Sequence, residues 1–561
     1  MGPTSWKNRT LRVLKCGQYV IGEDTYRCPH LRFARNALES LYRHRRDEAW
    51  NELLALFRAA LQCETPPLRG IAWLLNTLRF AFAWGRSGTV IDDEIWSRVT
   101  DRCWATESSV ERQDAALALD AIAQWREEGY QSLAPCAVAI GQWINQVDGD
   151  CAFGVATLLN SLINHDEPLF ATVCCHSRPE LIAGAFAGAE PSEGYSWGYL
   201  LSRLSFAPED WRRRLKSALD VPALYALVEK CTRSDIMHLS EISQGIAGLD
   251  TGLSLEIAEK VAPIMADALT AAPSEAFRDS RQFIRFVLGY APGFLRRNPP
   301  RARQRRVARC LVKAVHPDAI ARAISASRRR DWEVYGELLF FTREVMPSHA
   351  RSIVKKIDFD ALDKATKGQW GRIPGELRHL IAALATAHGE PVCSWIDRHK
   401  EEFVSLDPVV AAVAPHAAVT ALHRGVPLDL RNEGHLATVA VPPLAKVDEK
   451  VAIGVLKDNI LAIAGFLSNV ESTYCGVVPR FLDLLEELSP ATLERVLQVV
   501  EPAVAEKKWA ERLRGRTKER EAVAALLNLI PTGTGKLNAV ADRLRKRFPR
   551  ATAYPTKKGS R

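Results

Sequence analysis

One short segment of the chain has the residue types of a phosphate-binding loop. Residues 530–537 read IPTGTGKL, and in such loops glycine amides and a following lysine hold phosphate oxygens. A working loop needs a glycine where Ile530 stands, and a Ser or Thr hydroxyl for Mg²⁺ where Leu537 stands. We therefore expect a turn between helices here, and no bound nucleotide.

The other side chains suited to metal binding or catalysis lack a working spacing. Cys174, Cys175 and His176 are adjacent, whereas zinc sites use CxxC or HxxxH spacing. Single histidines such as His379 have no Ser, Cys or Asp at a spacing that indicates a catalytic triad. We therefore expect no metal, no cofactor and no enzymatic activity.

Two basic clusters offer a different chemistry. Guanidinium groups bind phosphate through paired hydrogen bonds, and a nearby aromatic ring can stack on a base. One cluster follows a Pro-Pro break, and the other flanks Phe548. The candidate phosphate or nucleic-acid contacts are Arg301, Arg303, Arg305, Arg306, Arg543, Arg545, Lys546, Arg547 and Arg550. The alternative is that both runs are solvated helix faces.

Positive charge is concentrated in the last tenth of the sequence. Residues 507–561 contain 16 Lys plus Arg and 4 Asp plus Glu, a net charge of +12, while all 561 residues carry +9. The first 506 residues therefore carry 9 minus 12, or −3. A basic tail on a near-neutral body can attract nucleic acid, an anionic membrane surface or an acidic protein, and it can equally serve solubility.

Cysteine usage and hydropathy favour a cytoplasmic protein. The 12 cysteines include no CxxC pair, which is typical of free thiols in a reducing compartment. The longest charge-free apolar run, 408–422, contains Pro415 and is shorter than the roughly 20 residues of a membrane-spanning helix. We expect a buried helix pair there and no membrane partner.

Three stretches, 214–224, 308–324 and 350–366, repeat one apolar pattern. The equivalent positions are Leu215, Leu311 and Ile353, then Leu219, Val315 and Ile357, then Leu224, Ile320 and Leu362. A helical pattern that recurs with a period in the forties is typical of stacked helix pairs. We therefore expect an all-α fold, an α-solenoid of HEAT- or TPR-like helix pairs.

Composition and pattern divide the chain into four segments. Strand-like residues around Gly22 suggest a small winged-helix-like piece over 1–45, with a fully helical start as the alternative. Ten of the 14 tryptophans fall at or before Trp211, and we expect a Trp-rich helical region over 46–210. The repeat solenoid covers 211–505 and a basic helical tail covers 506–561. Residues 436–441 are the only other extended-looking piece.

The repeat unit and the N-terminal piece together resemble the C-terminal half of STAND NTPases, signalling ATPases of bacterial antiviral defence and innate immunity. Residues 25–38 (TYRCPHLRFARNAL) are similar to the family's winged-helix exit, and residues 332–362 are similar to units of its ligand-sensing helical arrays. The chain departs from the family because it has no Walker motifs. The resemblance therefore implies a sensor region without the NTPase core, and no nucleotide-binding residue carries over.

The sequence thus predicts a non-catalytic interaction or sensor protein that recognises a protein ligand or partner subunit through one face of a helical stack. The resemblance places that role in a bacterial STAND-like defence system. The alternative is a helical-repeat protein that binds nucleic acid through its basic tail. Its affinity would fall steeply with salt, because each neutralised phosphate releases counterions.

Overall fold

The computed structural model describes residues 46–63, 66–82, 91–126, 128–289, 300–428, 430, 434–471, 474–515, 517–533 and 535–549. Within these ranges the fold is all-α, as the sequence predicts. The described backbone contains no strand, and its one isolated bridge joins Leu406 to Leu428 in parallel. The predicted winged-helix-like piece over 1–45, and the alternative to it, lie outside the described residues.

The chain divides into two compact units, Met1–Ala314 and Val315–Arg561. The first contains α4 Arg46–Leu61, α5 Leu68–Phe82, α6 Asp93–Trp104, α7 Ser109–Ala123, α8 Ala137–Asn145, α9 Gly149–His165, α10 Glu167–Cys175, α11 Pro179–Ala187, α12 Gly194–Leu204, α13 Glu209–Ala218, α14 Val221–Lys230, α15 Ile236–Leu249, α16 Thr251–Ala271, α17 Pro273–Asp279, α18 Arg281–Val287 and α19 Ala302–Ala314.

The second unit contains α20 Pro317–Ser325, α21 Arg329–Val345, α22 Pro347–Lys355, α23 Phe359–Thr366, α24 Gly375–Ala387, α25 Gly389–Arg398, α26 Pro408–Val413, α27 Pro415–His423, α28 Ala437–Val447, α29 Glu449–Asp458, α30 Ile460–Ser468, α31 Val478–Leu488, α32 Pro490–Val499, α33 Pro502–Leu513, α34 Thr517–Leu529 and α35 Lys536–Arg547. The boundary between the units falls inside the segment 211–505 that the sequence assigns to the repeats.

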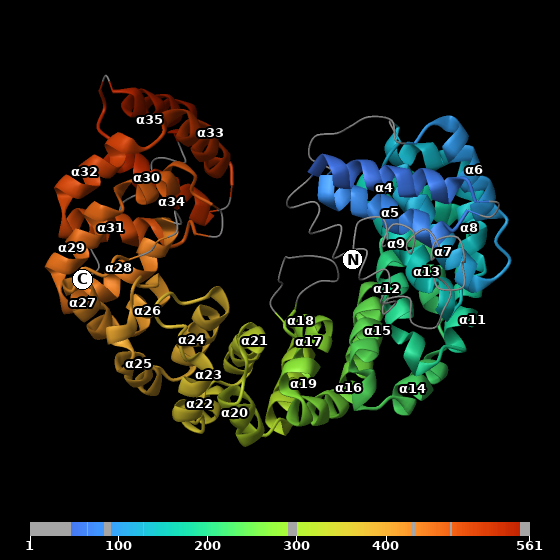
Figure 1. The fold of residues 1–561 in the computed structure, drawn as a ribbon, viewed down its shortest axis with the longest axis horizontal. Helices are drawn as coiled ribbons and strands as arrows, with labels where there is room; N and C mark the ends of the chain where they lie inside the picture. Colours follow the sequence, from blue (N-terminus) through green and yellow to red (C-terminus); the bar gives the residue numbers. More distant parts are fainter. Residues whose placement is uncertain are drawn as a thin grey trace. The chain divides into compact units, whose positions relative to one another are not determined.

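Helices in the first unit form two layers. One layer contains α5, α7, α9, α12 and α15, each packed on the next. The other layer contains α8, α11 and α13, followed by α14, α16 and α19. Figure 1 shows α12 and α15 on one side of this unit, with α11 and α14 on the opposite side. Each helix thus buries one stripe against its own layer and another against the facing layer.

The apolar columns read from the sequence form the core. Leu215, Leu311 and Ile353 are each at most 1% exposed. The columns of Leu219 and of Leu224 are buried as well. Each copy is one helix, an extended corner and a second helix, with apolar residues at i, i+4 and i+9. The structure reveals two more copies, whose corresponding residues are all buried. One copy contains Val173, Ser177 and Ile182, and the other contains Val496, Val500 and Ala505.

A recurrent hydrogen bond attaches this corner to the end of an earlier helix. The backbone N–H that precedes the second helix donates to a polar side chain 33 residues earlier. Asp358 donates to Ser325 Oγ over 2.9 Å, and Glu501 donates to Ser468 Oγ over 3.0 Å. Arg178 donates to Asn145 Oδ1 in the same way. These bonds satisfy backbone donors that a helix start leaves unpaired, and they attach each corner to an earlier helix.

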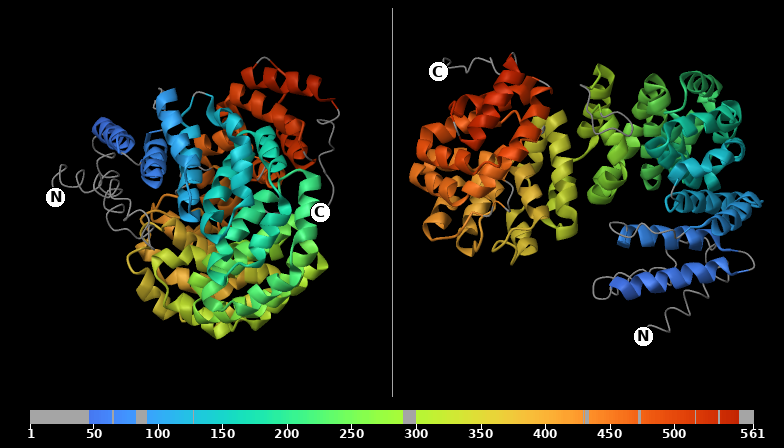
Figure 2. Two further views of the ribbon diagram at one scale, coloured as in Figure 1. Left: turned by 90° about the vertical axis from the view of Figure 1, so that its right-hand side faces the viewer. Right: turned by 90° about the horizontal axis from the view of Figure 1, so that it is seen from above.

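The basic tail is built from helices that continue the stack of the second unit. Trp509 on α33 is completely buried, and its Nε1–H donates to the carbonyl of Leu467 over 2.9 Å. Arg512 Nε donates to the carbonyl of Val470 over 3.0 Å. Figure 2 shows α33, α34 and α35, in red, packed against the orange helices of this unit.

One local prediction is confirmed and one is wrong. The apolar run 408–422 forms the predicted buried helix pair, α26 and α27. The stretch 436–441 is helical instead of extended, because it begins α28. Ala437, Ala440, Val441 and Leu444 bury one face of α28 at helical spacing, and this burial outweighs the strand preference of the valines.

Candidate interaction face

Arg303, a predicted phosphate contact, is held inside the first unit. Its guanidinium forms two hydrogen bonds with the Glu259 carboxylate, at 2.9 and 2.8 Å, and lies 3.7 Å from Glu256. The hydrogen bond with Glu259 raises the pKa of Arg303, so the charged form is favoured. Arg303 therefore joins α19 to α16, and few of its N–H donors remain for a ligand outside the unit.

The other arginines of that cluster remain on the surface. The Arg301 backbone N–H donates to Gln304 Oε1 at the start of α19 over 2.8 Å, and its side chain is exposed. Arg305 and Arg306 are also exposed on α19. These three side chains stay available for an anionic ligand.

In the basic tail, Arg543 and Arg545 also have partners within the unit. Arg543 forms a fork with Glu506 at 2.8 and 2.7 Å. Arg545 donates to the carbonyls of Leu527 and Ile530 at the end of α34. A cation at a helix C-terminus satisfies orphan carbonyls and opposes the helix dipole. Both arginines therefore attach helices of the stack to one another.

Lys546 and Arg547, like Arg543, are exposed. Arg547 and Arg514 both lie against the Phe548 ring, with the guanidinium carbon 5.5 and 5.8 Å from its centroid. Arg550 lies outside the described residues. The two sequence-predicted clusters belong to different units of the chain.

The segment similar to a phosphate-binding loop and the Cys174–His176 segment are parts of the helical framework. Gly535 is the N-cap of α35, and the motif connects α34 to α35. Cys174 is buried on α10 while Cys175 is exposed. In the part of the chain that the structure covers, no cluster of three or more His, Cys, Asp or Glu side chains could hold a metal ion.

The face that sequence reasoning missed lies on the layer formed by α9, α12 and α15. Glycines bring α9 close to α7 and α12 close to α15. A Cβ on Gly154 of α9 would lie 2.9 Å from Gln113 Cα of α7, and one on Gly198 of α12 would lie 2.5 Å from the Ile242 nitrogen of α15. Such close crossings place side chains of neighbouring helices in direct contact.

Half-buried aromatic residues cover this layer. The Phe153 ring centroid lies 6.0 Å from that of Tyr195 and 5.7 Å from that of Tyr199. The Arg203 guanidinium lies 4.8 Å from the Tyr199 centroid, and its NH1 donates to Asn160 Oδ1 over 2.8 Å. We call the set of Phe153, Asn160, Tyr195, Tyr199, Arg203 and Glu241 the Tyr199 face.

Glu241 adds a carboxylate to the Tyr199 face. No ion pair within 4 Å and no hydrogen bond joins its side chain to the described residues. Burial raises the pKa of Glu241 to about 7, and the positive charge of Arg203 only partly opposes the rise. Burial also raises the pKa of the neighbouring Tyr199. A carboxylate held in this state is typical of functional sites.

Only a weak sequence signal pointed to the Tyr199 face. Tyr195, Tyr199 and Arg203 recur every four residues, which places them on one side of a helix. Phe153 and Glu241 come from helices roughly 40 residues away on either side. No local motif joins them, because the close crossings that bring them together are a property of the packed layer.

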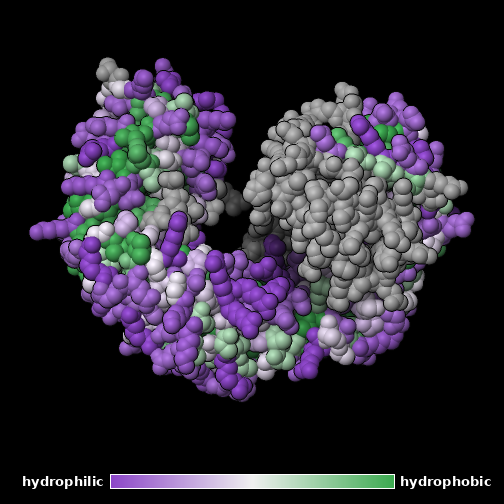
Figure 3. Space-filling view, viewed as in Figure 1, coloured by the Kyte–Doolittle hydropathy of each residue, from purple (hydrophilic) through white to green (hydrophobic). Residues whose placement is uncertain are grey.

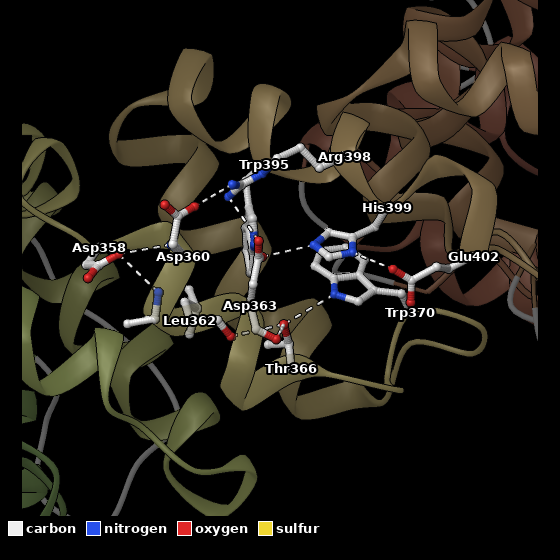
Figure 4. A network of polar contacts seen from close by, with 11 residues as sticks. Asp358, Asp360, Leu362, Asp363, Thr366, Trp370, Trp395, Arg398, His399 and Glu402 are labelled. Carbon is white, nitrogen blue, oxygen red and sulfur yellow. Dashed lines mark hydrogen bonds and ion pairs between the residues drawn. The ribbon is translucent and has the colours of Figure 1, made fainter.

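A second polar network, in the second unit, surrounds His399 (Figure 4). Its ring stacks on Trp370 with centroids 4.2 Å apart. Its Nε2 lies 2.9 Å from Asp363 Oδ1 and its Nδ1 lies 2.7 Å from Glu402 Oε1. Both ring nitrogens therefore lie against carboxylates of the same network.

The Asp363 carboxylate joins the same network to α25. It also accepts from Trp395 Nε1 and lies 3.2 Å from Arg398 NH2. Trp370 and Trp395 are buried. The network therefore ties α23 and α25 to the loop that contains Trp370, and its polar groups bind one another.

Apolar side chains also reach the surface of the second unit (Figure 3). Leu461 on α30 is 76% exposed, and Val439 on α28 and Val477 are more than 40% exposed. In the described chain, no single helix is long and apolar enough to cross a membrane. The pair α29 and α30, bent by 70°, reaches that length and composition only when the two helices are counted together.

Comparisons with known proteins provide no family for this chain. No family model matches it, and a search of curated proteins finds no match. A solved engineered protein from a structural genomics consortium is similar over 81% of this chain and 98% of its own, with 12% identity and a TM-score of 0.36. At that TM-score the likeness supports no further argument.

Proposed function

We propose that this protein is a non-catalytic interaction or sensor protein that recognises a protein ligand through the Tyr199 face. The observation that carries the proposal is the clustering of Phe153, Tyr195 and Tyr199 beside Arg203 on one surface of a helical stack. Tyr and Arg are enriched among residues that dominate the energy of protein interfaces. Stacked helix pairs bind partners through such extended surfaces.

The resemblance to STAND sensor arrays suggests the biological setting. A helical stack that senses a ligand fits a cytoplasmic bacterial defence system in which the NTPase core is supplied by another chain. The partner would then be a protein ligand of foreign origin or a subunit of the same system. This part of the proposal rests on the resemblance and on the helical-repeat architecture.

Site-specific photo-crosslinking tests the proposal. A photoreactive amino acid replaces Tyr199, and in a control it replaces Arg213, which is exposed on α13 in the other layer. Crosslinking in the producing cells, followed by mass spectrometry, should give one partner protein from position 199 and none from position 213. Identical products from both positions, or none from position 199, would contradict recognition through the Tyr199 face.

Nucleic-acid binding by the basic tail is the second candidate. The observation that favours it is the exposed Arg547 guanidinium against the Phe548 ring, with the exposed Lys546 next to Arg547 in the sequence. Deleting the tail is a poor test, because buried Trp509 belongs to it. The double substitution of Lys546 and Arg547 by Ala should instead lower the slope of log affinity against log salt by about 2. An unchanged slope would exclude these residues as phosphate contacts.

A further inference from the structure

The exposed side of α19, in the first unit, carries positive charge and no negative charge. The helix reads ARQRRVARCLVKA and contains no Asp or Glu. It turns by about 100° per residue, and this rotation places four exposed cations within about 100° of one another, away from the buried stripe that includes Val307 and Leu311. We call these four residues the α19 basic face: Arg305, Arg306, Arg309 and Lys313.

The α19 basic face opposes the stability of its own helix. Arg309 lies four residues after Arg305 and four before Lys313, and like charges at that spacing repel each other. Arg305 also lies in the first turn of α19, where the helix dipole disfavours a cation. The core does not require these charges, because all four side chains are exposed. A charge pattern of this kind indicates an anionic ligand.

Exposed cations on the neighbouring helices of this layer are paired with carboxylates. The pairs on α13 and α16 are Arg213 with Asp210, Arg214 with Glu180, Lys216 with Asp250 and Lys260 with Glu229. On α19, Arg303 follows this pattern with Glu259. Arg306 acts on Glu259 only at longer range. Within the described ranges, the α19 basic face forms no ion pair, so its charge faces solvent.

We propose that the α19 basic face binds the phosphate backbone of a nucleic-acid duplex. Arg305, Arg309 and Lys313 form a row along the helix with a rise of about 6 Å between successive members. Such a row meets a line of anions, and each strand of a duplex presents one phosphate per about 3.4 Å of its axis. Guanidinium groups bind phosphate oxygens through paired hydrogen bonds. The proposal depends neither on the Tyr199 face nor on the basic tail.

Other anionic ligands fit the α19 basic face less well. A free phosphate needs cations that converge on one point, whereas this row extends over about 12 Å. A membrane-binding helix needs large apolar or aromatic residues beside its cations, and the other residues exposed on α19 are Ala302, Cys310 and Ala314.

The composition of α19 also favours a duplex over a single strand. Proteins that bind single strands stack the bases on aromatic rings, and the sequence of α19 contains no aromatic residue. Cations that contact only phosphates do not read the base sequence. We therefore expect binding that is independent of sequence. An acidic protein segment presents a lower density of charge than a duplex, so it should bind more weakly.

Fluorescence anisotropy from about 50 to 300 mM salt tests the proposal. The probes are labelled DNA and RNA duplexes of about 20 base pairs, one of their single strands, and a polyglutamate peptide. We expect the intact protein to bind a duplex most tightly. The triple variant Arg305→Gln, Arg309→Gln and Lys313→Gln should lower the slope of log affinity against log salt by about 3. Its affinity near 100 mM salt should fall by about tenfold or more.

The matched control removes the same charge from α13, through Arg213→Gln, Arg214→Gln and Lys216→Gln. These cations are paired within the unit, so the slope should not change. The double variant Arg305→Lys and Arg309→Lys keeps the charge and should keep the slope, with a lower affinity because lysine has no guanidinium fork. Circular dichroism of each variant confirms that lost binding is not lost folding.

Four results would overturn the proposal. They are no duplex binding at about 50 mM salt, tighter binding of the single strand or of polyglutamate, an unchanged slope in the α19 triple variant, and an equal loss in the α13 control. The last would show that net charge alone causes binding. Substitution of Lys546 and Arg547 in the same assay measures the tail separately, and photo-crosslinking at position 199 uses no nucleic acid. Failure at α19 therefore leaves both candidate functions standing.

Discussion

Gly198 of α12 and Gly245 of α15 lie against each other where the two helices cross. A Cβ on Gly245 would lie 3.1 Å from Gly198 Cα, and a Cβ on Gly198 would overlap the main chain of Glu241. The absence of both side chains permits backbone contact at this crossing. The crossing holds Tyr199 and Glu241 next to each other, so the Tyr199 face depends on it.

Gly198→Ala should therefore lower the free energy of unfolding of the first unit by about 1–3 kcal/mol, as overpacking does elsewhere. Urea denaturation followed by circular dichroism measures the change. The matched control is Gly184→Ala on α11, where a Cβ would meet no atom within 4 Å. That substitution should stabilise the unit by about 0.5–1 kcal/mol through helix propensity. Equal effects of the two substitutions would show that the crossing is loose.

Ser468→Ala tests the bond that joins the corner before α33 to the end of α30. Ser468 is 3% exposed, and its Oγ accepts the Glu501 N–H. The substitution leaves that N–H without its partner, so stability should fall by about 1–3 kcal/mol. Ser394→Ala, at an exposed position on α25, should change stability by less than about 0.5 kcal/mol. Thermal unfolding of both variants measures the difference, and similar melting temperatures would rule out a stabilising role for the Ser468 bond.

Substitutions at His399 separate stacking from hydrogen bonding. His399→Phe keeps a flat ring over Trp370 but removes both ring nitrogens and their polar contacts, which should cost about 1–3 kcal/mol. His399→Ala also removes the stacked ring and should cost about 1 kcal/mol more. Chemical denaturation of the second unit measures both, with exposed His416→Ala on α27 as control. If Phe restored the stability of the native residue, the contacts with Asp363 and Glu402 would contribute nothing.

Glu241→Gln should change how stability depends on pH. The folded state raises the pKa of Glu241 from 4.5 to about 7, so it binds the proton more tightly than the unfolded chain does. Stability from this group is therefore present below pH 4.5 and is lost as pH rises to about 7. The Gln variant should be more stable than the native protein by up to about 3 kcal/mol at pH 8 and nearly equal at pH 4. Melting temperatures across this range measure the effect, and a constant difference would contradict it.

The contribution of His238 to stability should change with pH in the direction opposite to that of Glu241. Burial lowers its pKa below 6.5, against the opposing charges of Asp235 and Asp279, and its Nδ1 accepts the Tyr195 N–H over 3.1 Å. The unfolded chain thus binds this proton more readily. Its contribution is present above pH 6.5 and is lost as pH falls below it. His238→Gln should reduce the loss of stability between pH 7 and pH 5, measured by thermal unfolding. An unaltered loss would mean that other groups cause the acid sensitivity.

Much of the fold could be predicted from the spacing of apolar residues close together in the sequence. The spacing of Leu215, Leu219 and Leu224 predicted a helix, a corner and a second helix, because an amphipathic helix must bury its apolar stripe. The same reasoning placed a helix pair at 408–422. It failed at 436–441, where the alternation of valines suggested a strand. Two repeat copies were missed because Ser177 and Ala505 stand where the other copies have larger apolar residues.

The sequence by itself determined the class of the fold, the positions of the repeated cores and the concentration of positive charge, since each depends on residues close together in the chain. Tertiary structure alone decided which charged groups are available. It paired Arg303 with Glu259 and Arg543 with Glu506, and it raised the pKa of Glu241 by burial. The physical reason is that burial and ion pairing are set by neighbours 30 to 45 residues away. Their contact depends on how closely one helix packs on the next.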